Sequence, residues 1–326
     1  MNASPIALVL GATGGIGGEM ARGLRRRGWH VRALHRRAAE MAGRDGLEWL
    51  QGDAMHADDV VRAADGAALI VHAVNPPGYT RWNELVMPML ESSIAAARAS
   101  GARIVLPGTV YNFAPDVPQP VGEDAPQRPV TRKGRIRADM EARLREVAAQ
   151  GVRTLIVRAG DFFGPQAGNT WFGQGVVQAG KPVKRVMAAS APGVGHQWAY
   201  LPDVAETMLR LLEQDARLGD FEVFHMDGHW DPDGRAMAAA IQRAVGRPVP
   251  VRAFPWWLLA LASPFVTLFR EMQEMRYLWK RPLRMSNRKL VAFLGAEPHT
   301  PLDDAVRATL VGNGCLDAAE GAGAVC

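Results

Sequence analysis

Cysteine is almost absent from this sequence of 326 residues: there are two, Cys315 and Cys326, both near its C-terminal end. Such a pair supplies neither a disulfide framework nor a cysteine-based metal cluster, so no metal site is expected. The sequence around Met1 also lacks a charged segment followed by an apolar stretch and a small-residue cleavage site. We therefore expect a protein of the reducing cytoplasm.

Long hydrophobic runs are missing as well. The most apolar stretch, residues 254–269, is too short to span a bilayer and is interrupted by Pro264, so it is not a transmembrane helix. We expect a helix-turn-helix packed on a second lobe. The alternatives for this stretch are peripheral contact with a membrane and the interface of a homodimer.

No long block of like charge occurs either. The net charge of +5 arises mainly from arginines that are scattered over many segments. Nucleic-acid binding is therefore not expected, and phosphate-bearing small molecules explain a basic balance equally well. The hydrophobic and charged fractions, 48% and 22%, are those of an ordinary globular protein.

What is present is a regular alternation of short apolar runs and helical patterns over residues 1–160. This alternation is typical of βαβ units and predicts an α/β fold, a Rossmann-type doubly wound parallel sheet. The predicted strands are residues 6–10, 30–34, 47–50, 69–72, 104–106 and 154–157. The predicted helices are residues 15–27, 58–64, 81–100 and 136–149.

After Thr170 the alternation fades. Asp203 as N-cap and Glu206 as its capping-box partner predict a helix over residues 204–214, and a strand follows over residues 221–225. Both elements would return to the main sheet. A chain of this length is expected to form one large core with a smaller appendage. The predicted division is a dinucleotide-binding domain of residues 1–165 with 196–228, and a smaller, mainly helical substrate lobe of residues 166–195 and 229–326.

Glycines cluster where the first predicted strand meets the first predicted helix, in Gly11-Ala12-Thr13-Gly14-Gly15-Ile16-Gly17. At such a turn, glycines permit a tight bend and a close approach of backbone to phosphate, and the helix N-terminus attracts negative charge. We predict that a dinucleotide binds here, through Gly11, Thr13, Gly14, Gly15, Ile16 and Gly17.

The end of the second predicted strand bears on the choice of dinucleotide. An acidic residue at this point would bind the ribose 2′-hydroxyl of NAD, but the sequence reads Leu34-His35-Arg36-Arg37. A guanidinium suits the 2′-phosphate of NADP, so Arg36 is predicted to bind it. NADP is therefore the predicted cofactor, with NAD as the alternative if both arginines are only solvated.

The spacing GxxGxxG, together with Gln51-Gly52-Asp53, resembles the extended short-chain dehydrogenase/reductase superfamily, of the NAD-dependent epimerase/dehydratase type. The resemblance continues through three further segments, residues 71–75, 158–165 and 200–205. It implies that Asp53, with Ala54 beside it, meets the adenine ring and that the backbone near Ala73 lines the cofactor. The alternative for Asp53 is a turn or cap aspartate.

The catalytic pattern of that superfamily is broken in this sequence. Its members place a Ser or Thr after the fifth strand and a Tyr-x-x-x-Lys pair on the next helix, where the tyrosine gives a proton to a carbonyl. Here Pro107 stands at the serine position. Laid on the family pattern, Thr131 replaces the tyrosine and Arg135 the lysine.

Four residues remain as catalytic candidates around that position. Thr109 could supply a hydroxyl, Arg135 could hold a ribose hydroxyl, and Tyr111 or Lys133 could replace the missing proton donor. The alternatives are a turn threonine, a core tyrosine and a solvated lysine.

Two functions are compatible with these observations. The first is an NADP(H)-dependent oxidoreductase or epimerase-like enzyme that acts on a small carbonyl or alcohol substrate with a non-standard proton donor. The second is a non-catalytic, NADP-binding regulatory or sensor protein, which the loss of both hallmark residues favours. We favour the enzyme, because the candidate residues lie in the segments that the family sets around the nicotinamide.

Overall fold

The computed structural model describes residues 4–76, 81–167 and 170–317. Its main sheet has seven strands in the order β10-β6-β5-β4-β1-β2-β3, and every neighbouring pair is parallel. The strands are β1 (Ile6–Leu10), β2 (His30–His35), β3 (Glu48–Gln51), β4 (Ala67–His72), β5 (Arg103–Thr109), β6 (Thr154–Ala159) and β10 (Phe221–His225). The predicted doubly wound sheet is thus confirmed.

Helices cover both faces of this sheet, which is why its central strands are apolar on both sides. One buried cluster joins a face of the sheet to α1 (Gly15–Arg26), α5 (Leu201–Leu212) and α9 (Arg288–Leu294). The cluster on the opposite face includes α2 (Ala57–Ala63), α3 (Trp82–Ser100) and α4 (Arg132–Ala148). Short helical turns complete this part of the chain at η1 (Ala38–Met41), η2 (Arg44–Gly46), η4 (Val110–Asn112) and η6 (Asp215–Arg217).

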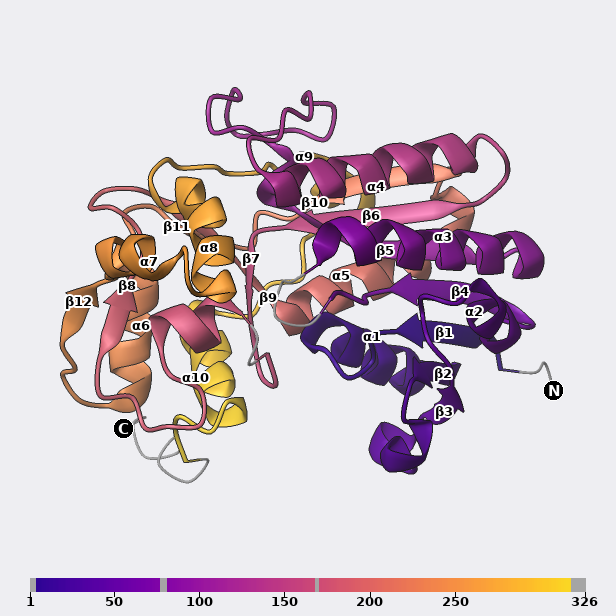
Figure 1. The fold of residues 1–326 in the computed structure, drawn as a ribbon, viewed down its shortest axis with the longest axis horizontal. Helices are drawn as coiled ribbons and strands as arrows, with labels where there is room; N and C mark the ends of the chain where they lie inside the picture. Colours follow the sequence, from indigo (N-terminus) through magenta and orange to yellow (C-terminus); the bar gives the residue numbers. More distant parts are fainter. Residues whose placement is uncertain (1–3, 77–80, 168–169, 318–326) are drawn as a thin grey trace.

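The second lobe lies beside the carboxyl ends of the main strands (Figure 1). It contains a three-stranded sheet of β7 (Asp161–Phe163), β9 (His196–Tyr200) and β11 (His229–Asp231), and a two-stranded sheet of β8 (Val186–Ala188) and β12 (Val251–Ala253). Its helical elements are η5 (Phe172–Val176), α6 (Ala236–Val245), α7 (Trp256–Ala262), α8 (Thr267–Glu274), η7 (Met275–Trp279) and α10 (Leu302–Gly312). The predicted division of the chain into domains stays a prediction.

The predicted capping box at Asp203 is wrong. Helix α5 begins at Leu201, with Tyr200 as its N-cap, because Pro202 fits the first turn of a helix. The Asp203 carboxylate accepts hydrogen bonds from the backbone N–H and the hydroxyl of Thr300, at 2.8 and 2.7 Å. Glu206 forms an ion pair with Arg27, the C-cap residue of helix α1, which packs beside α5.

The helix-turn-helix predicted for residues 254–269 is present as α7 and α8, although α8 continues to Glu274. No helix within the described residues is long and apolar enough to cross a membrane.

The register of the sheet fixes where its functional loops begin. Leu10 at the end of β1 is level with Leu34 of β2 on one side and with His72 of β4 on the other. The strand order also reverses here, since β1 separates β2 from β4. Ligands of such sheets bind at the carboxyl ends of the strands beside this reversal.

Candidate active site

A cleft of about 560 Å³ lies at this point, between the main sheet and the second lobe. Ligand pockets generally measure about 300–1,000 Å³, so its size suits a dinucleotide. The predicted cofactor residues that line it are Gly11, Thr13, Gly14, Gly15, Ile16, Arg36, Ala54 and Ala73. Tyr111, Asp161 and Trp171 line the opposite part.

Within the glycine turn, Gly11 and Gly17 have no room for a side chain, and a Cβ on Gly14 would lie 3.3 Å from the carbonyl oxygen of Gly11. A Cβ on Gly11, whose φ is +88°, would lie 2.5 Å from the carbonyl oxygen of Ala73, and one on Gly17 would lie 2.2 Å from that of Gly11. Gly14 is the extended N-cap of α1, and no side chain caps the helix there. The N–H groups of the first turn therefore have no side-chain acceptor at the N-cap, an arrangement that fits a pyrophosphate.

The two arginines after β2 are not equivalent. Arg37 forms an ion pair with Glu40, at 3.2 Å. Arg36 lines the cleft, and among the residues that the structure describes no carboxylate pairs with its guanidinium. Arg36 is thus the one of the two whose charge is available to a ligand in the cleft.

Asp53 forms a turn beside the cleft. Its Oδ1 accepts a hydrogen bond from the backbone N–H of Met55 at 3.0 Å, and its own N–H donates to Asp59 Oδ2 at 2.9 Å. Its neighbours Gly52 and Ala54 line the cleft. Asp53 therefore acts as a turn aspartate in this structure, which was the alternative to adenine binding, and its contact with adenine stays a prediction.

Tyr111, which is half-buried, is joined by hydrogen bonds to the buried side chains of Asp161 and His196. Its hydroxyl donates to Asp161 Oδ1 at 3.0 Å, and Asp161 Oδ2 lies 3.0 Å from His196 Nε2. The His196 ring stacks on Trp279, with 3.7 Å between the ring centroids. No local sequence pattern marks Asp161 or His196 as a site residue, because they lie on β7 and β9 of the smaller sheet, 50 and 85 residues along the chain from Tyr111.

Lys133 is buried, with 1% of its surface exposed, so the solvated alternative is wrong. Its ammonium donates to the carboxylates of Glu271 and Glu274, the latter at 3.0 Å, and to the backbone carbonyl of Glu271 at 3.3 Å. Burial alone would raise the pKa of Glu271, but hydrogen bonds from Lys133 and Arg132 outweigh it and lower that pKa. The cluster ties α4 of the main domain to α8 of the second lobe.

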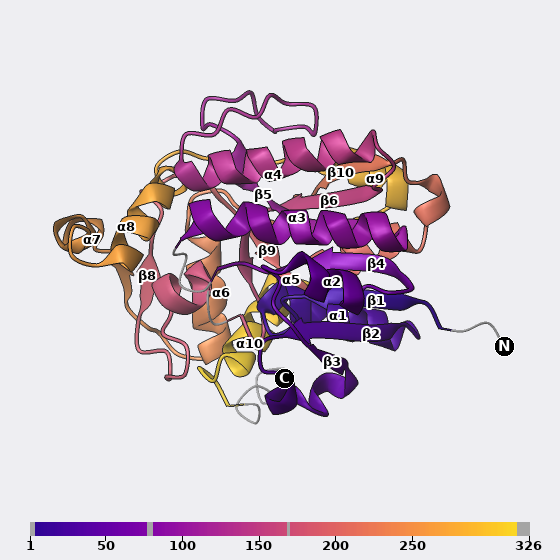
Figure 2. The ribbon, with the colours of Figure 1, turned by 45° about the vertical axis from the view of Figure 1, so that its right-hand side comes forward.

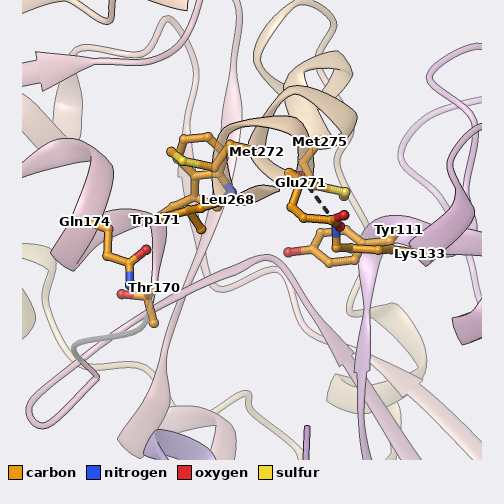
Figure 3. A pocket seen from close by; sticks show the side chains of 9 residues that line it. All are labelled: Tyr111, Lys133, Thr170, Trp171, Gln174, Leu268, Glu271, Met272 and Met275. Atoms are coloured by element: carbon orange, nitrogen blue, oxygen red, sulfur yellow. Dashed lines mark hydrogen bonds and ion pairs between the residues drawn. The ribbon is translucent and has the colours of Figure 1, made fainter. Parts of the chain in front are cut away.

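Tyr111 and Lys133 lie side by side in a smaller pocket (Figure 3). This pocket shares Tyr111 and Trp171 with the large cleft, so the two cavities adjoin. The apolar part of the remaining lining comes from α8 and the turn after it, in Leu268, Met272 and Met275, and Thr170, Gln174 and Glu271 form the polar part. A substrate seated there would meet the Tyr111 hydroxyl at the boundary with the cleft.

The structure does not bring the other two catalytic candidates into these cavities. Thr109 ends β5, where its Oγ1 accepts from the Tyr111 N–H at 3.3 Å, as expected of a turn threonine. Arg135 is exposed. Residues four apart share a helix face, so it is Arg137 that accompanies Lys133 inward. Arg137 donates to Asn75 Oδ1, in the wall of the cleft, at 2.9 Å.

A buried polar network supports the segment that carries Tyr111. Arg158 Nε donates to Glu141 at 3.0 Å, and Glu141 also accepts from the side-chain amide of Asn112 at 2.9 Å. Arg158 donates in addition to His225 Nε2 at 2.8 Å. Burial, followed by the charge of Arg158, lowers the pKa of His225 to about 3.

A doubly wound sheet with an uncapped glycine turn and a cleft of this size defines a dinucleotide-binding protein of the Rossmann type. Residues 7–226 match the NAD dependent epimerase/dehydratase family, and the chain belongs to that family. The prediction of an enzyme that resembles the extended short-chain dehydrogenases is thereby confirmed, and so is the prediction of a nicotinamide dinucleotide as its cofactor.

Individual relatives agree with this assignment. A 3-diazoavenalumate denitrifying reductase of a Streptomyces species is 30% identical over 201 residues, which span 57% of this chain and 63% of that protein. The UDP-glucose 4-epimerase of Bifidobacterium longum, solved with NAD+ and UDP, superposes with a TM-score of 0.71 at 14% identity, over 97% of this chain and 99% of that one. The UDP-N-acetylglucosamine 4-epimerase of Bacillus cereus gives 0.72 at 15% identity, over 97% and 98%. At such identities the two structures establish the shared fold.

Proposed function

We propose that this protein is an NADP(H)-dependent oxidoreductase that acts on a small carbonyl or alcohol substrate and uses Tyr111 as its proton donor. The observation that carries the proposal is the place of Tyr111, which lines both the cofactor cleft and the adjoining smaller pocket, with its hydroxyl bonded to Asp161 of the cleft. A proton donor must stand within reach of the oxygen that changes charge, and this boundary is where such an oxygen would lie.

The residues present fit the cofactor. The N-terminus of α1 would hold the pyrophosphate, Arg36 the 2′-phosphate, and the chain after β4, at Ala73 and Asn75, the nicotinamide half. When bound, NADPH supplies a hydride to the substrate carbon. Arg137 positions Asn75 through the hydrogen bond between them.

The protein's own groups complete the reduction. Tyr111 gives its phenolic proton to the substrate oxygen as the carbonyl carbon gains the hydride, which leaves an alcohol and a phenolate. The phenolic hydrogen, which points to Asp161 in this structure, turns to the substrate oxygen in this step. Asp161 bridges Tyr111 and His196 with its two oxygens, so a proton released by the imidazolium form of His196 can pass through that carboxyl group to the phenolate, which restores the phenol and leaves a neutral imidazole. The stacking of His196 on Trp279 keeps its ring in line with Asp161.

Lys133 is assigned a positioning role in this proposal. Its ammonium is ion-paired with Glu271 and Glu274, and Lys133 lines only the smaller pocket, whereas Tyr111 lines the cofactor cleft as well. The ion pairs hold α8, and with it the apolar wall of the pocket, against α4.

A reductase is favoured over an epimerase because the relative at 30% identity is called a reductase, whereas the sugar epimerases share the fold at 14–15% identity. The pocket, of about 30 Å³, has room only for a small group of a substrate seated in the cleft, and its side chains Leu268, Met272 and Met275 favour an apolar group there.

A screen of carbonyl compounds for loss of reduced-nicotinamide absorbance tests the proposal. With a substrate found, Tyr111→Phe should lower kcat by about 10²- to 10⁴-fold, the usual contribution of general acid catalysis, and leave the NADPH dissociation constant unchanged. Tyr200→Phe is the matched control, because Tyr200 is buried but lines neither cavity.

Equal kcat for the native protein and Tyr111→Phe would remove Tyr111 as donor and return attention to Lys133. If NADPH binds tightly but a broad screen yields no turnover, the non-catalytic sensor replaces the enzyme as the better account.

A further inference from the structure

The hairpin of α7 and α8 exposes five large apolar side chains that no neighbouring element covers in the described chain. Phe265 is 89% exposed, Trp257 71% and Leu261 69%, and Leu258 and Val266 are 45% and 38% exposed. They lie on α7 and in the turn that leads into α8. Figure 2 shows α7 at the outer edge of the molecule, away from the main sheet.

The opposite side of the hairpin is firmly attached. Leu259 is buried, and the ring of Trp256 lies 5.6 Å from that of Trp171. Gln273 of α8 donates to the backbone carbonyl of Trp256 at 2.9 Å. The exposed side chains therefore lie on a hairpin that is packed against the second lobe. An exposed apolar group of this kind generally marks a site that binds a protein, a membrane or a ligand.

The segment that carries this group has charges of one sign, and the exposed Glu84 of α3 lines a cavity together with Arg270. Residues 234–270 contain five arginines and no aspartate or glutamate. Arg252, which lies on β12 before the hairpin, and Arg270 of α8 are exposed. Glu271, the first acidic residue after this stretch, is buried in its ion pairs with Lys133 and Arg132.

A second copy of this chain fits the group less well than a lipid surface. A stable protein interface uses roughly 20–30 residues a side, whereas this group has five side chains on the tip of two short helices, and arginines at its rim would face arginines. Tryptophan, leucine and phenylalanine rimmed by arginine are the composition of a helix that lies in a membrane interface.

We propose that Trp257, Leu258, Leu261, Phe265 and Val266 dock this protein onto an anionic lipid surface, with Arg252 and Arg270 against the headgroups. The apolar side chains enter the boundary of headgroups and acyl chains, and the guanidinium groups bind lipid phosphates. Helix α8 also lines the pocket at Tyr111, so docking places the membrane beside the wall of that pocket.

Sedimentation with vesicles tests the proposal without any enzyme assay. The native protein should sediment with vesicles of phosphatidylcholine mixed with phosphatidylglycerol and stay in solution with phosphatidylcholine alone. The triple variant Trp257→Ser, Leu261→Ser, Phe265→Ser should bind at least about tenfold more weakly, since it removes most of the inserted apolar surface. The double variant Arg252→Gln, Arg270→Gln should bind the anionic vesicles about 30-fold more weakly. Added salt should also weaken the binding of the native protein.

Val130→Ser is the matched control, because Val130 is 51% exposed on the main domain and should bind like the native protein. Circular dichroism checks that each variant folds, and Phe265→Ser alone replaces the triple variant if that one does not. Absence of native binding, equal affinity for both vesicles, or undiminished binding by the apolar variants would overturn the proposal. A native dimer that the triple variant converts to a monomer, with no vesicle binding, would replace it with self-association.

Discussion

Replacing Arg158 with methionine tests whether the buried network behind Tyr111 stabilises the fold. Arg158 and Glu141 are 1% and 3% exposed, and the arginine donates through both Nε and Nη2. Its removal leaves the Glu141 carboxylate buried, and within the described part of the chain its remaining donors are the neutral amides of Asn112 and Gln127.

Breaking a buried ion pair by removing one partner generally costs about 3–5 kcal/mol. We expect the free energy of unfolding of Arg158→Met to fall by about that amount, a large part of the roughly 5–15 kcal/mol that stabilises a typical domain. Equilibrium unfolding in urea, followed by circular dichroism, measures the change.

The matched control is Arg243→Met. Arg243 also binds a carboxylate with two nitrogens, on Asp303, but both side chains are more than half exposed. Surface pairs contribute about 0–1 kcal/mol, so this variant should stay near the native stability. Equal, small losses in the two variants would refute the argument that burial makes the Arg158 network important.

Three further results are expected. Burial, followed by the charges of Arg137 and Arg158, lowers the pKa of His72 and His225 from 6.5 to about 3. Above pH 6.5 each ring is neutral in both the folded and the unfolded state and does not affect stability by titration. As the pH falls from 6.5 toward 3, only the unfolded state binds the proton, so each ring lowers the free energy of unfolding by up to about 1.4 kcal/mol per pH unit. Urea midpoints that stay flat well below pH 6.5 would contradict this. Gly14→Val should abolish NADPH binding and keep the native circular dichroism spectrum. Gly17→Val should prevent folding, because a Cβ on Gly17 would lie 2.2 Å from the Gly11 carbonyl oxygen. Retained NADPH binding by Gly14→Val would show that the turn is only structural. Asp161→Asn should lower kcat and shift the pH–rate profile without changing the NADPH dissociation constant, and an unshifted profile would remove the proton path through Asp161.

Local pattern predicted the main sheet well, because its strands and helices are specified by nearby apolar spacing and by the glycine turn. The strand at residues 221–225 has the predicted bounds. The capping box failed because the partners of Asp203 and Glu206 are tertiary: Thr300 lies 97 residues beyond Asp203, and Arg27 lies 179 residues before Glu206.

The candidate site was predicted less completely for the same reason. Tyr111 and Lys133 were found from their place in the family pattern, but the side chains that they contact lie 50 and 138 residues away. One signal was available and missed. Once Lys133 is taken to face inward, a helical spacing of four residues selects Arg137, and Arg135 falls on the exposed side.

The claim that this cleft holds NADP(H) through Arg36 is tested most directly by titrating the protein with NADPH and NADH and measuring both dissociation constants. A charge-assisted contact to the 2′-phosphate predicts that NADPH binds on the order of 10- to 100-fold more tightly. Arg36→Ala should remove most of that difference, whereas Arg37→Ala, which loses an arginine already paired with Glu40, should keep it. Equal dissociation constants for the two cofactors in the native protein would contradict the claim.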